Sequence, residues 1–201
     1  MEKLTFYIDC DDTIFNSGQV VRKFLTNNGL KISENEDPYE LYYNLYPEER
    51  NNPKFQCLYD MQEIYPVFDY AIKVLKYLES SIHDVFAITC GQNIDNAYHK
   101  IKWFSHYGLK DMGFIFIPFN TDKQKSIVDM EGAVFIDNQE NYLNNSNAGN
   151  KILFGKENFE IFYVRDWIEL FVSIKRLESG LKLERPIPSE LQKYKAILDK
   201  L

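Results

Sequence analysis

Short apolar runs alternate with helical patterns along most of the chain, and this alternation limits the folds open to it. The apolar runs that predict strands are residues 4–9, 84–89, 113–119, 133–137, 151–154 and 161–164. Helical patterns follow or separate them at residues 68–79, 93–107, 122–130 and 166–177. Short strands that alternate with helices predict an α/β fold, with a parallel sheet and helices on both of its faces.

Residues 16–70 interrupt this alternation after the first strand, because they hold helical patterns without a strand signal. We expect one helix over residues 17–28, which Ser17 can cap. A second helix is expected to begin at Asp37-Pro38, where an aspartate cap precedes a proline in the first turn. A third is expected over residues 55–64. The interruption therefore predicts a small helical subdomain inserted into the α/β core.

On this basis the chain divides into three parts. Residues 1–15 and 71–178 are expected to form a Rossmann-like α/β core, and residues 16–70 a helical cap inserted after the first strand. Residues 179–201 are expected to form a linker and one more amphipathic helix, which Ser189 can cap.

Composition and charge exclude several classes of protein. The 201 residues are 45% hydrophobic and 15% aromatic, too apolar for a disordered chain, and no apolar run is long enough to cross a membrane. The net charge of −7 argues against duplex nucleic acid as a partner, because binding phosphates needs a basic surface. The three cysteines lack metal-site spacing and the N-terminus lacks a signal-peptide pattern, which together predict a reduced, cytoplasmic protein.

An acidic cluster follows the first predicted strand. Asp9, Asp11 and Asp12 come directly after an apolar run, and buried carboxylates are costly unless something neutralises them. In a parallel sheet, sites form at the carboxyl ends of the strands. One carboxylate could attack a substrate while the other moves a proton, and Mg²⁺ could relieve their repulsion. The plain alternative is an acidic turn or a helix cap.

Later segments place more polar residues beside strand ends. Thr89 ends a strand before Cys90-Gly91, where a hydroxyl and the N–H groups of a turn suit a phosphate, although an ordinary helix cap is the alternative. Asp137 ends another strand, in a position for a second metal ligand. Between them, Lys123 and Lys125 lie at the start of a predicted helix. Either lysine could reach a phosphate or the acidic pair, or simply face solvent.

This ordered set resembles the four motifs of the haloacid dehalogenase (HAD) superfamily of phosphotransferases. The motifs are present as Asp9-x-Asp11-x-Thr13, Thr89, Lys123 or Lys125, and Asp137. The helical insertion resembles the cap that some members carry between the first two motifs. More narrowly, residues 98–108 resemble the helix after the second motif in 5′(3′)-deoxyribonucleotidases.

The resemblance implies residue roles. Asp9 would be the nucleophile that forms an aspartyl-phosphate, and Asp11 would protonate the leaving oxygen and then activate water. Magnesium would be bound by Asp9, the backbone carbonyl of Asp11, and Asp137. The phosphoryl group would be bound by Thr89, Cys90, Lys123 and Lys100. Lys123 is preferred to Lys125 here because it follows the expected cap residue.

The resemblance also implies a small phosphorylated substrate, and the nucleotidase likeness implies a (deoxy)nucleoside monophosphate. One alternative is a phosphatase for another small phosphate ester or for a nucleic-acid 3′ end. Another is a non-catalytic protein that binds a phosphorylated ligand. Asn138, where many members have a second acid, favours this last alternative, and the presence of both Asp9 and Asp11 opposes it. Cys90-Gly91 replaces the Ser-Pro that nucleotidases tend to have, which bears on the substrate more than on the chemistry.

Overall fold

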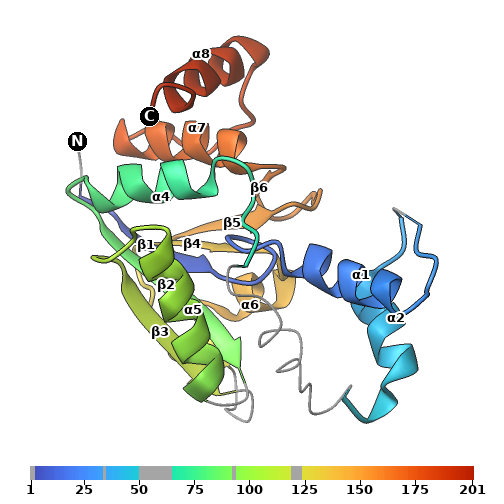
Figure 1. Cartoon of the computed structure of the whole chain (residues 1–201). Helices are drawn as coiled ribbons and strands as arrows, with labels where there is room; N and C mark the ends of the chain where they lie inside the picture. The colour runs from blue at the N-terminus through green and yellow to red at the C-terminus, as the bar shows by residue number, and fades with distance from the viewer. Residues whose placement is uncertain (1–2, 34, 50–64, 92–93, 119–123) are drawn as a thin grey trace.

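A six-stranded parallel sheet forms the centre of the molecule, with the strand order β3-β2-β1-β4-β5-β6 (Figure 1). The computed structural model describes residues 3–33, 35–49, 65–91, 94–118 and 124–201. The strands are β1 (Thr5–Asp9), β2 (Asp84–Gly91), β3 (Gly113–Pro118), β4 (Val134–Asp137), β5 (Asn150–Phe154) and β6 (Tyr163–Val164). All neighbouring strands pair in parallel. The α/β fold class predicted from the sequence is confirmed.

Helices cover both faces of the sheet. One face carries α4 (Ala71–Glu79), α5 (Ile94–His106) and α7 (Trp167–Glu178), which bury a large apolar cluster against the strands. The opposite face carries α6 (Glu140–Asn145) and the 3₁₀ turn η2 (Gln124–Ile127), which pack against a smaller cluster. Successive side chains of a strand point to opposite faces, so each strand contributes to both clusters.

A helical unit lies to one side of the sheet, between β1 and α4 in the chain (Figure 1). It comprises α1 (Ser17–Asn27), α2 (Pro38–Leu45) and the 3₁₀ turn η1 (Pro47–Glu49). Val21, Leu25 and Tyr42 form its own small buried cluster. The third helix expected over residues 55–64 lies outside the described residues.

The cap of α2 is predicted correctly from the sequence, and the cap of α1 is not. Asp37 caps α2 as expected, because its carboxylate accepts hydrogen bonds from N–H groups of the first turn. The prediction that Ser17 caps α1 is wrong. Asn16 caps it instead, with Oδ1 accepting from the Gln19 N–H at 3.1 Å. The Ser17 hydroxyl is engaged elsewhere, since it donates to Asp11 at 2.9 Å.

The chain leaves the sheet for the helical unit and returns from it at adjacent points. Phe15 and Val67 form an antiparallel bridge, and the Asn16 N–H donates to the Pro66 carbonyl at 2.8 Å. Phe15 is fully buried, with its ring centroid 5.3 Å from that of Trp103. These contacts fix the attachment of the unit close to the end of β1.

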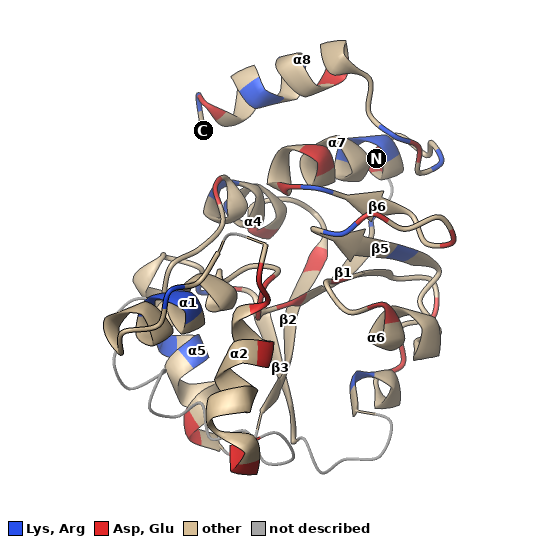
Figure 2. Cartoon of the chain, turned by 90° about the vertical axis from the view of Figure 1, so that its right-hand side faces the viewer, with Lys and Arg blue, Asp and Glu red and all other residues tan. Residues whose placement is uncertain are grey.

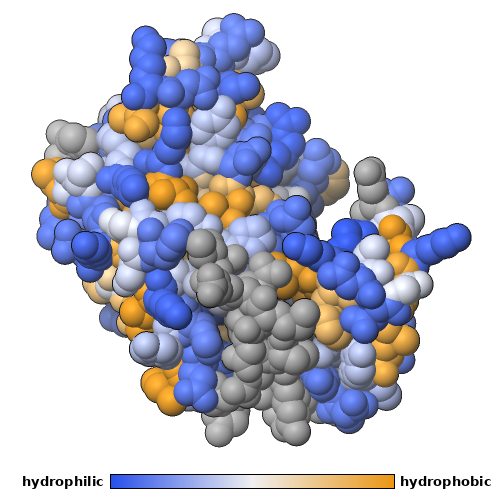
Figure 3. Space-filling view, in the orientation of Figure 1, coloured by the Kyte–Doolittle hydropathy of each residue, from blue (hydrophilic) through white to orange (hydrophobic). Residues whose placement is uncertain are grey.

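The last helix, α8 (Pro188–Leu198), packs on α7. The side of α8 that is visible in Figure 3 is mostly hydrophilic. Its residue Leu198 is fully buried. The prediction that Ser189 caps this helix is wrong. The helix begins at Pro188, so the cap position is two residues before Ser189, at Ile187, whose N–H donates to Glu190 at 3.0 Å.

The apolar faces of the helices pack on the core of the protein. Among the described residues, no helix combines the length and the apolar character that crossing a membrane requires. Figure 2 shows basic and acidic residues interspersed along α7 and α8. These C-terminal helices therefore carry mixed charge rather than a basic stripe.

Candidate active site

Three carboxylates gather where two neighbouring strands end. Asp9 is the last residue of β1 and Asp137 is the last residue of β4, and these strands pair in parallel. Asp11 follows β1 by two residues. The side chains of Asp9 and Asp137 are 5% and 0% exposed, whereas that of Asp11 is 30% exposed. Of the three carboxylates, Asp11 is therefore the one that reaches solvent.

A buried lysine joins the two most buried carboxylates. Lys125 on η2 places Nζ 2.5 Å from Asp9 Oδ1 and 2.6 Å from Asp137 Oδ2, and its side chain is 3% exposed. Lys123, the lysine predicted from the sequence for this position, lies outside the described residues. Among the lysines that the structure describes, Lys125 is the one that contacts Asp9.

A second buried lysine reaches Asp11 from α5. Lys100 Nζ donates to Asp11 Oδ2 and, at 2.6 Å, to Thr89 Oγ1. The other oxygen of Asp11 accepts from the Ser17 hydroxyl at 2.9 Å. Thr89 and Lys100, the predicted phosphate ligands, thus lie together beside Asp11. The sequence pattern does not indicate Ser17 as a site residue, because a serine just before an apolar stripe is typical of a helix cap.

The second carboxylate oxygen of Asp9, Oδ2, is contacted by Thr13, which is itself hydrogen-bonded to Trp167. Thr13 donates to Asp9 Oδ2 at 3.2 Å, and the Thr13 carbonyl accepts from Trp167 Nε1 at 2.9 Å. Trp167 is the first residue of α7 and is fully buried. Trp167 and Thr13 are 154 residues apart, and nothing in the sequence pattern links them.

The carboxylates have unequal pKa values. Burial raises the pKa of Asp9 to about 7, while Lys125 opposes the rise and the charges of Asp137 and Asp11 add to it. Burial also raises the pKa of Asp137 above its ordinary value, against the effect of Lys125. Burial would raise the pKa of Asp11 too, but the adjacent Lys100 outweighs it and holds that pKa below its usual range.

Asp12 ties the helical unit to the site. It adopts a left-handed backbone conformation with φ of 56°, which costs a residue with a side chain about 1–2 kcal/mol. Its Oδ1 accepts from the Gly18 N–H at 2.7 Å, and Tyr39 also hydrogen-bonds to its carboxylate. These bonds offset the cost and anchor the starts of α1 and α2 next to Asp11.

The two described cysteines beside the site are neutral thiols. Cys90 lies in the apolar cluster under η2 and α6, and burial raises its pKa to about 11. Cys10 is fully buried in the cluster on the other face, where burial raises its pKa as well. A reactive thiolate needs a lowered pKa. The group of Cys90 that is predicted to contact phosphate is therefore its backbone N–H and not its thiol.

The donor atoms at this edge of the sheet suit a hard divalent cation. The carboxylates of Asp9 and Asp137 converge on one ammonium group, so their oxygens lie within reach of one small cation. When all are ionised, the three carboxylates outnumber Lys100 and Lys125 by one charge. Within the described ranges, no three His, Cys, Asp or Glu side chains form a complete metal site. Magnesium fits such a partial site, since it commonly binds one or two carboxylates and keeps several waters.

Comparison with known proteins identifies the fold. The sequence matches no protein-family model and no curated protein. Among solved structures, it matches magnesium-bound YfnB from Bacillus subtilis with a TM-score of 0.55 and 12% identity, over 85% of this chain and 98% of that one. A HAD-superfamily hydrolase of subfamily IA from Geobacter sulfurreducens matches with a TM-score of 0.54 and 12% identity, over 90% and 96% of the two chains. This is the HAD fold. A haloacid dehalogenase-like hydrolase from Xanthomonas campestris also matches, with a TM-score of 0.52 and 14% identity, over 89% and 97%.

Within the HAD fold, the motif residues of this chain surround one edge of the sheet. Asp9 and Asp11 lie at the end of β1, Thr89 in β2, Lys125 on η2 and Asp137 at the end of β4. These side chains form two hydrogen-bonded groups. Lys125 joins Asp9 and Asp137, and Lys100 joins Asp11 and Thr89. Structural similarity at only 12–14% identity shows a shared fold and no more, so the reaction has to be argued from the site itself.

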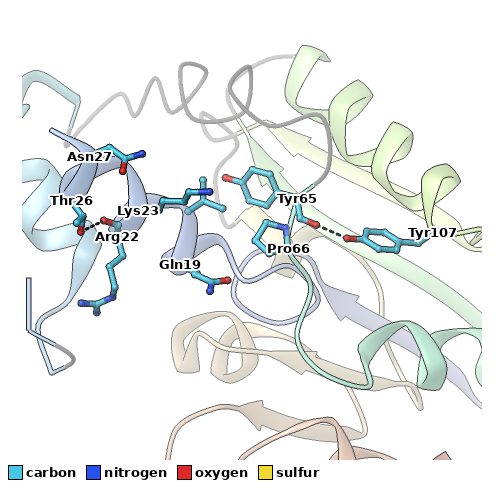
Figure 4. A pocket seen from close by; sticks show the side chains of 9 residues that line it. Gln19, Arg22, Lys23, Thr26, Asn27, Tyr65, Pro66 and Tyr107 are labelled. Atoms are coloured by element: carbon cyan, nitrogen blue, oxygen red, sulfur yellow. Dashed lines mark hydrogen bonds between the residues drawn. The ribbon is translucent and has the colours of Figure 1, made fainter. Parts of the chain in front are cut away.

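A separate cavity lies beside α1 (Figure 4). Its volume is about 460 Å³, and its described lining comes from α1 together with Tyr65, Pro66 and Tyr107. The Tyr107 hydroxyl donates to the Tyr65 carbonyl at 2.7 Å, and the Tyr65 ring stacks on Trp103 with centroids 4.2 Å apart. The described lining shares no residue with the carboxylate and lysine cluster.

Proposed function

We propose that this protein is a Mg²⁺-dependent phosphomonoesterase that works through an aspartyl-phosphate on Asp9. One observation carries the proposal: a buried carboxylate, Asp9, held by Lys125, lies beside a more exposed one, Asp11, held by Lys100. Two carboxylates in such different surroundings suit two different roles. The buried one is the nucleophile, and the exposed one carries protons to and from the substrate.

The proposed reaction has two steps. In the first, a carboxylate oxygen of Asp9 attacks phosphorus, the ester P–O bond breaks, and Asp11 protonates the leaving oxygen. In the second, Asp11 removes a proton from water, the water oxygen attacks phosphorus, and the bond to Asp9 breaks. In the free protein Lys100 keeps Asp11 ionised. The proton for the first step therefore has to arrive with the substrate, because the monoanion of a phosphate monoester carries one proton.

Charge neutralisation supports both steps, because phosphoryl transfer depends mainly on positioning and electrostatics. In this proposal Lys100 and Thr89, which contact each other next to Asp11, bind phosphoryl oxygens, and Lys125, which contacts Asp9, orients its carboxylate. Magnesium, bound by Asp9, Asp137 and the backbone carbonyl of Asp11, would supply further positive charge to the phosphoryl group.

The test of this chemistry is a screen of small phosphomonoesters with and without Mg²⁺. We expect Asp9→Asn to abolish turnover and phosphoenzyme formation. Asp11→Asn should slow turnover by on the order of 10²–10⁴-fold, the usual contribution of a general acid or base, while phosphate still binds. Asp129→Asn, the same change at an exposed acid bonded to Asn147, is the matched control and should keep full activity. Full activity in excess EDTA, or in Asp9→Asn, would contradict the mechanism.

We further propose that the substrate is a (deoxy)nucleoside monophosphate. Support comes from the resemblance of residues 98–108 to deoxyribonucleotidases and from the aromatic residues of the helical unit. Tyr42 belongs to the buried cluster of that unit, whereas Tyr39 hydrogen-bonds to Asp12 at the edge of the site. Tyr39 is thus a candidate to contact a base, and stacking on an aromatic ring contributes about 1–3 kcal/mol per base.

The substrate proposal is tested by kcat/KM for deoxynucleoside monophosphates, sugar phosphates and p-nitrophenyl phosphate. We expect nucleotides to be preferred, and Tyr39→Leu to lower kcat/KM for nucleotides by roughly tenfold while sparing sugar phosphates. Tyr39→Phe keeps the ring and separates stacking from the bond to Asp12. If abasic deoxyribose phosphate reacts as fast as a nucleotide, base recognition is wrong and the phosphatase chemistry still stands.

A further inference from the structure

The lysine that joins Asp9 and Asp137 follows a residue with unusual backbone geometry. Lys125 comes directly after Gln124, whose φ is +41°. Residues with a side chain rarely adopt a positive φ, because Cβ crowds the backbone. The turn η2 is only four residues long, and so short a 3₁₀ turn has few hydrogen bonds of its own to impose this conformation. Contacts from outside η2 must therefore hold Gln124 in place.

η2 packs on β2, β3 and α6, and Tyr142 of α6 is the side chain that contacts both Gln124 and Lys125. Its hydroxyl donates to Gln124 Oε1, and its ring centroid lies 4.5 Å from Lys125 Nζ. One side chain thus contacts both the left-handed residue and the ammonium group of the next residue. The neighbouring Leu143 is fully buried, and α6 packs on β4 and β5. The ring is therefore presented from a fixed helix.

The ring completes the surroundings of the Lys125 ammonium group. An ammonium group has three N–H donors, and carboxylate oxygens of Asp9 and Asp137 accept two of them. The face of an aromatic ring attracts a cation by its negative quadrupole. With Tyr142 on the remaining side, Lys125 has one favoured orientation, in which both carboxylates are contacted at once.

We propose that Tyr142 is a positioning residue for the reaction: its hydroxyl holds Gln124 in the left-handed conformation and its ring orients Lys125 toward Asp9. The proposal rests on the proposed phosphatase function, since it concerns the placement of Lys125 for that reaction. Tyr142 acts through Lys125 and has no chemical step of its own.

Two substitutions separate the two contacts. Tyr142→Phe removes the hydroxyl and keeps the ring, and we expect kcat to fall by roughly three- to tenfold with little change in KM. Tyr142→Leu removes both, and kcat should fall by roughly 30- to 100-fold. Tyr163→Phe is the matched control. That tyrosine also has a cation over its ring, with Arg185 Cζ at 3.8 Å, and its replacement should leave kcat unchanged.

A rescue experiment tests the part assigned to the hydroxyl. Glycine adopts a positive φ without crowding, so Gln124→Gly should remove the need for the hydroxyl. We expect Tyr142→Phe to lower kcat in the wild-type background and to have less than about a twofold effect in the Gln124→Gly background. A general loss of packing would lower kcat equally in both. Equal losses would therefore overturn this part of the proposal.

A measurement that needs no activity separates this proposal from the proposed function. The ring of Tyr142 should shift the NMR signals of the Lys125 side chain, and the shift should persist in Tyr142→Phe and vanish in Tyr142→Leu. If the shift is present and the protein hydrolyses no phosphate ester, the function is wrong while the placement of Lys125 stands. If the shift is absent, or if Tyr142→Leu keeps wild-type kcat at an unchanged Tm, the proposal is overturned.

Discussion

Each buried charge at the carboxyl edge of the sheet has a specific partner. Lys125 pairs with Asp9 and Asp137, and Lys100 pairs with Asp11. Removing one member of a buried ion pair typically costs about 3–5 kcal/mol, because the remaining charge is left without compensation. The residues proposed for the reaction should therefore also contribute to the stability of the protein.

The substitution Lys125→Met tests the choice between the two candidate lysines. Lys125→Met keeps the apolar stem and removes the charge, so we expect kcat/KM to fall at least about 100-fold. The free energy of unfolding should also fall, by on the order of a few kcal/mol. Lys123→Met, the matched change two positions earlier, should leave both near the wild-type values. Steady-state kinetics and urea denaturation check this, and the reverse pattern would assign the role to Lys123.

Asp9 makes the stability of the metal-free protein depend on pH. Its pKa of about 7 lies above the ordinary value of 3.8, so the folded protein binds a proton that the unfolded chain releases. The stability that this proton provides is complete below about pH 4 and is lost as the pH rises through 7. In Asp9→Asn, Lys125 keeps its pair with Asp137, so its charge stays compensated, and the carboxylate whose ionisation opposes folding is gone. In EDTA, this substitution should therefore raise the Tm at pH 8, with a smaller gain at pH 5. Thermal denaturation at both pH values measures this, and a lower Tm at pH 8 contradicts it.

The sequence predicts well which residues lie together where their position follows from a strand end. Asp9, Thr89 and Asp137 stand out for that reason, and the structure places them at one edge of the sheet. Roles that depend on a neighbour are different. Only the geometry of η2 shows Lys125 between two carboxylates, and only the folded chain brings Trp167 to Thr13.

At the scale of elements, length and periodicity decide what can be predicted. The strands and the long helices α1, α5 and α7 lie within a few residues of the expected ranges, because each has a repeating apolar pattern. The helix α6 is not predicted. It has six residues and one buried side chain, Leu143, so there is no period to detect. Its helical form comes from packing on β4 and β5 rather than from propensity.

The helix α8 is held to the core by the fully buried Leu198, by the partly buried Tyr194, whose ring meets that of Phe171, and by a few polar contacts. Leu198 is fully buried, its carbonyl accepts from Lys73 Nζ at 2.7 Å, and Glu190 pairs with Arg176. We expect Leu198→Ala to lower the free energy of unfolding by about 2–5 kcal/mol. Ile197→Ala, at the adjacent residue that is 39% exposed, should cost much less. Urea denaturation of the two variants makes the comparison, and equal losses would show that α8 is not docked through Leu198.

At the scale of the whole molecule, a buried polar network joins elements at the edge of the sheet opposite the active site. Glu178 of α7 accepts from Tyr77 of α4 at 2.7 Å, contacts His83 Nε2 at 2.9 Å and pairs with Lys175. His83 Nδ1 accepts the Leu4 N–H at 3.2 Å, so Nε2 carries the hydrogen that is shared with Glu178. The network connects two helices to the starts of the neighbouring strands β1 and β2.

The charge of Glu178 in this network should contribute to the free energy of unfolding that the protein loses as the pH falls. Burial would raise the pKa of Glu178, but hydrogen bonds from Lys175, His83 and Tyr77 outweigh it and lower the pKa below the ordinary value of 4.5. Such a carboxylate provides stability that is present above pH 4.5 and is lost as the pH falls through its folded-state pKa. Glu178→Gln should therefore be less stable at pH 7 and show a weaker loss in acid. Urea denaturation between about pH 3 and 7 tests this, and an acid loss as steep as that of the wild type contradicts it.

The order of strands in the sheet also has a consequence for synthesis on the ribosome. β1 lies between β2 and β4, so Thr5 pairs with Asp84 and Phe6 with Val134. The nascent strand therefore emerges long before either partner, and at about 5–20 residues per second the wait lasts several seconds. During that time an apolar segment with two unpaired edges is open to aggregation. The yield of soluble protein should thus depend on how quickly translation delivers residues 84–91 and 134–137, or on a chaperone that covers β1 in the meantime.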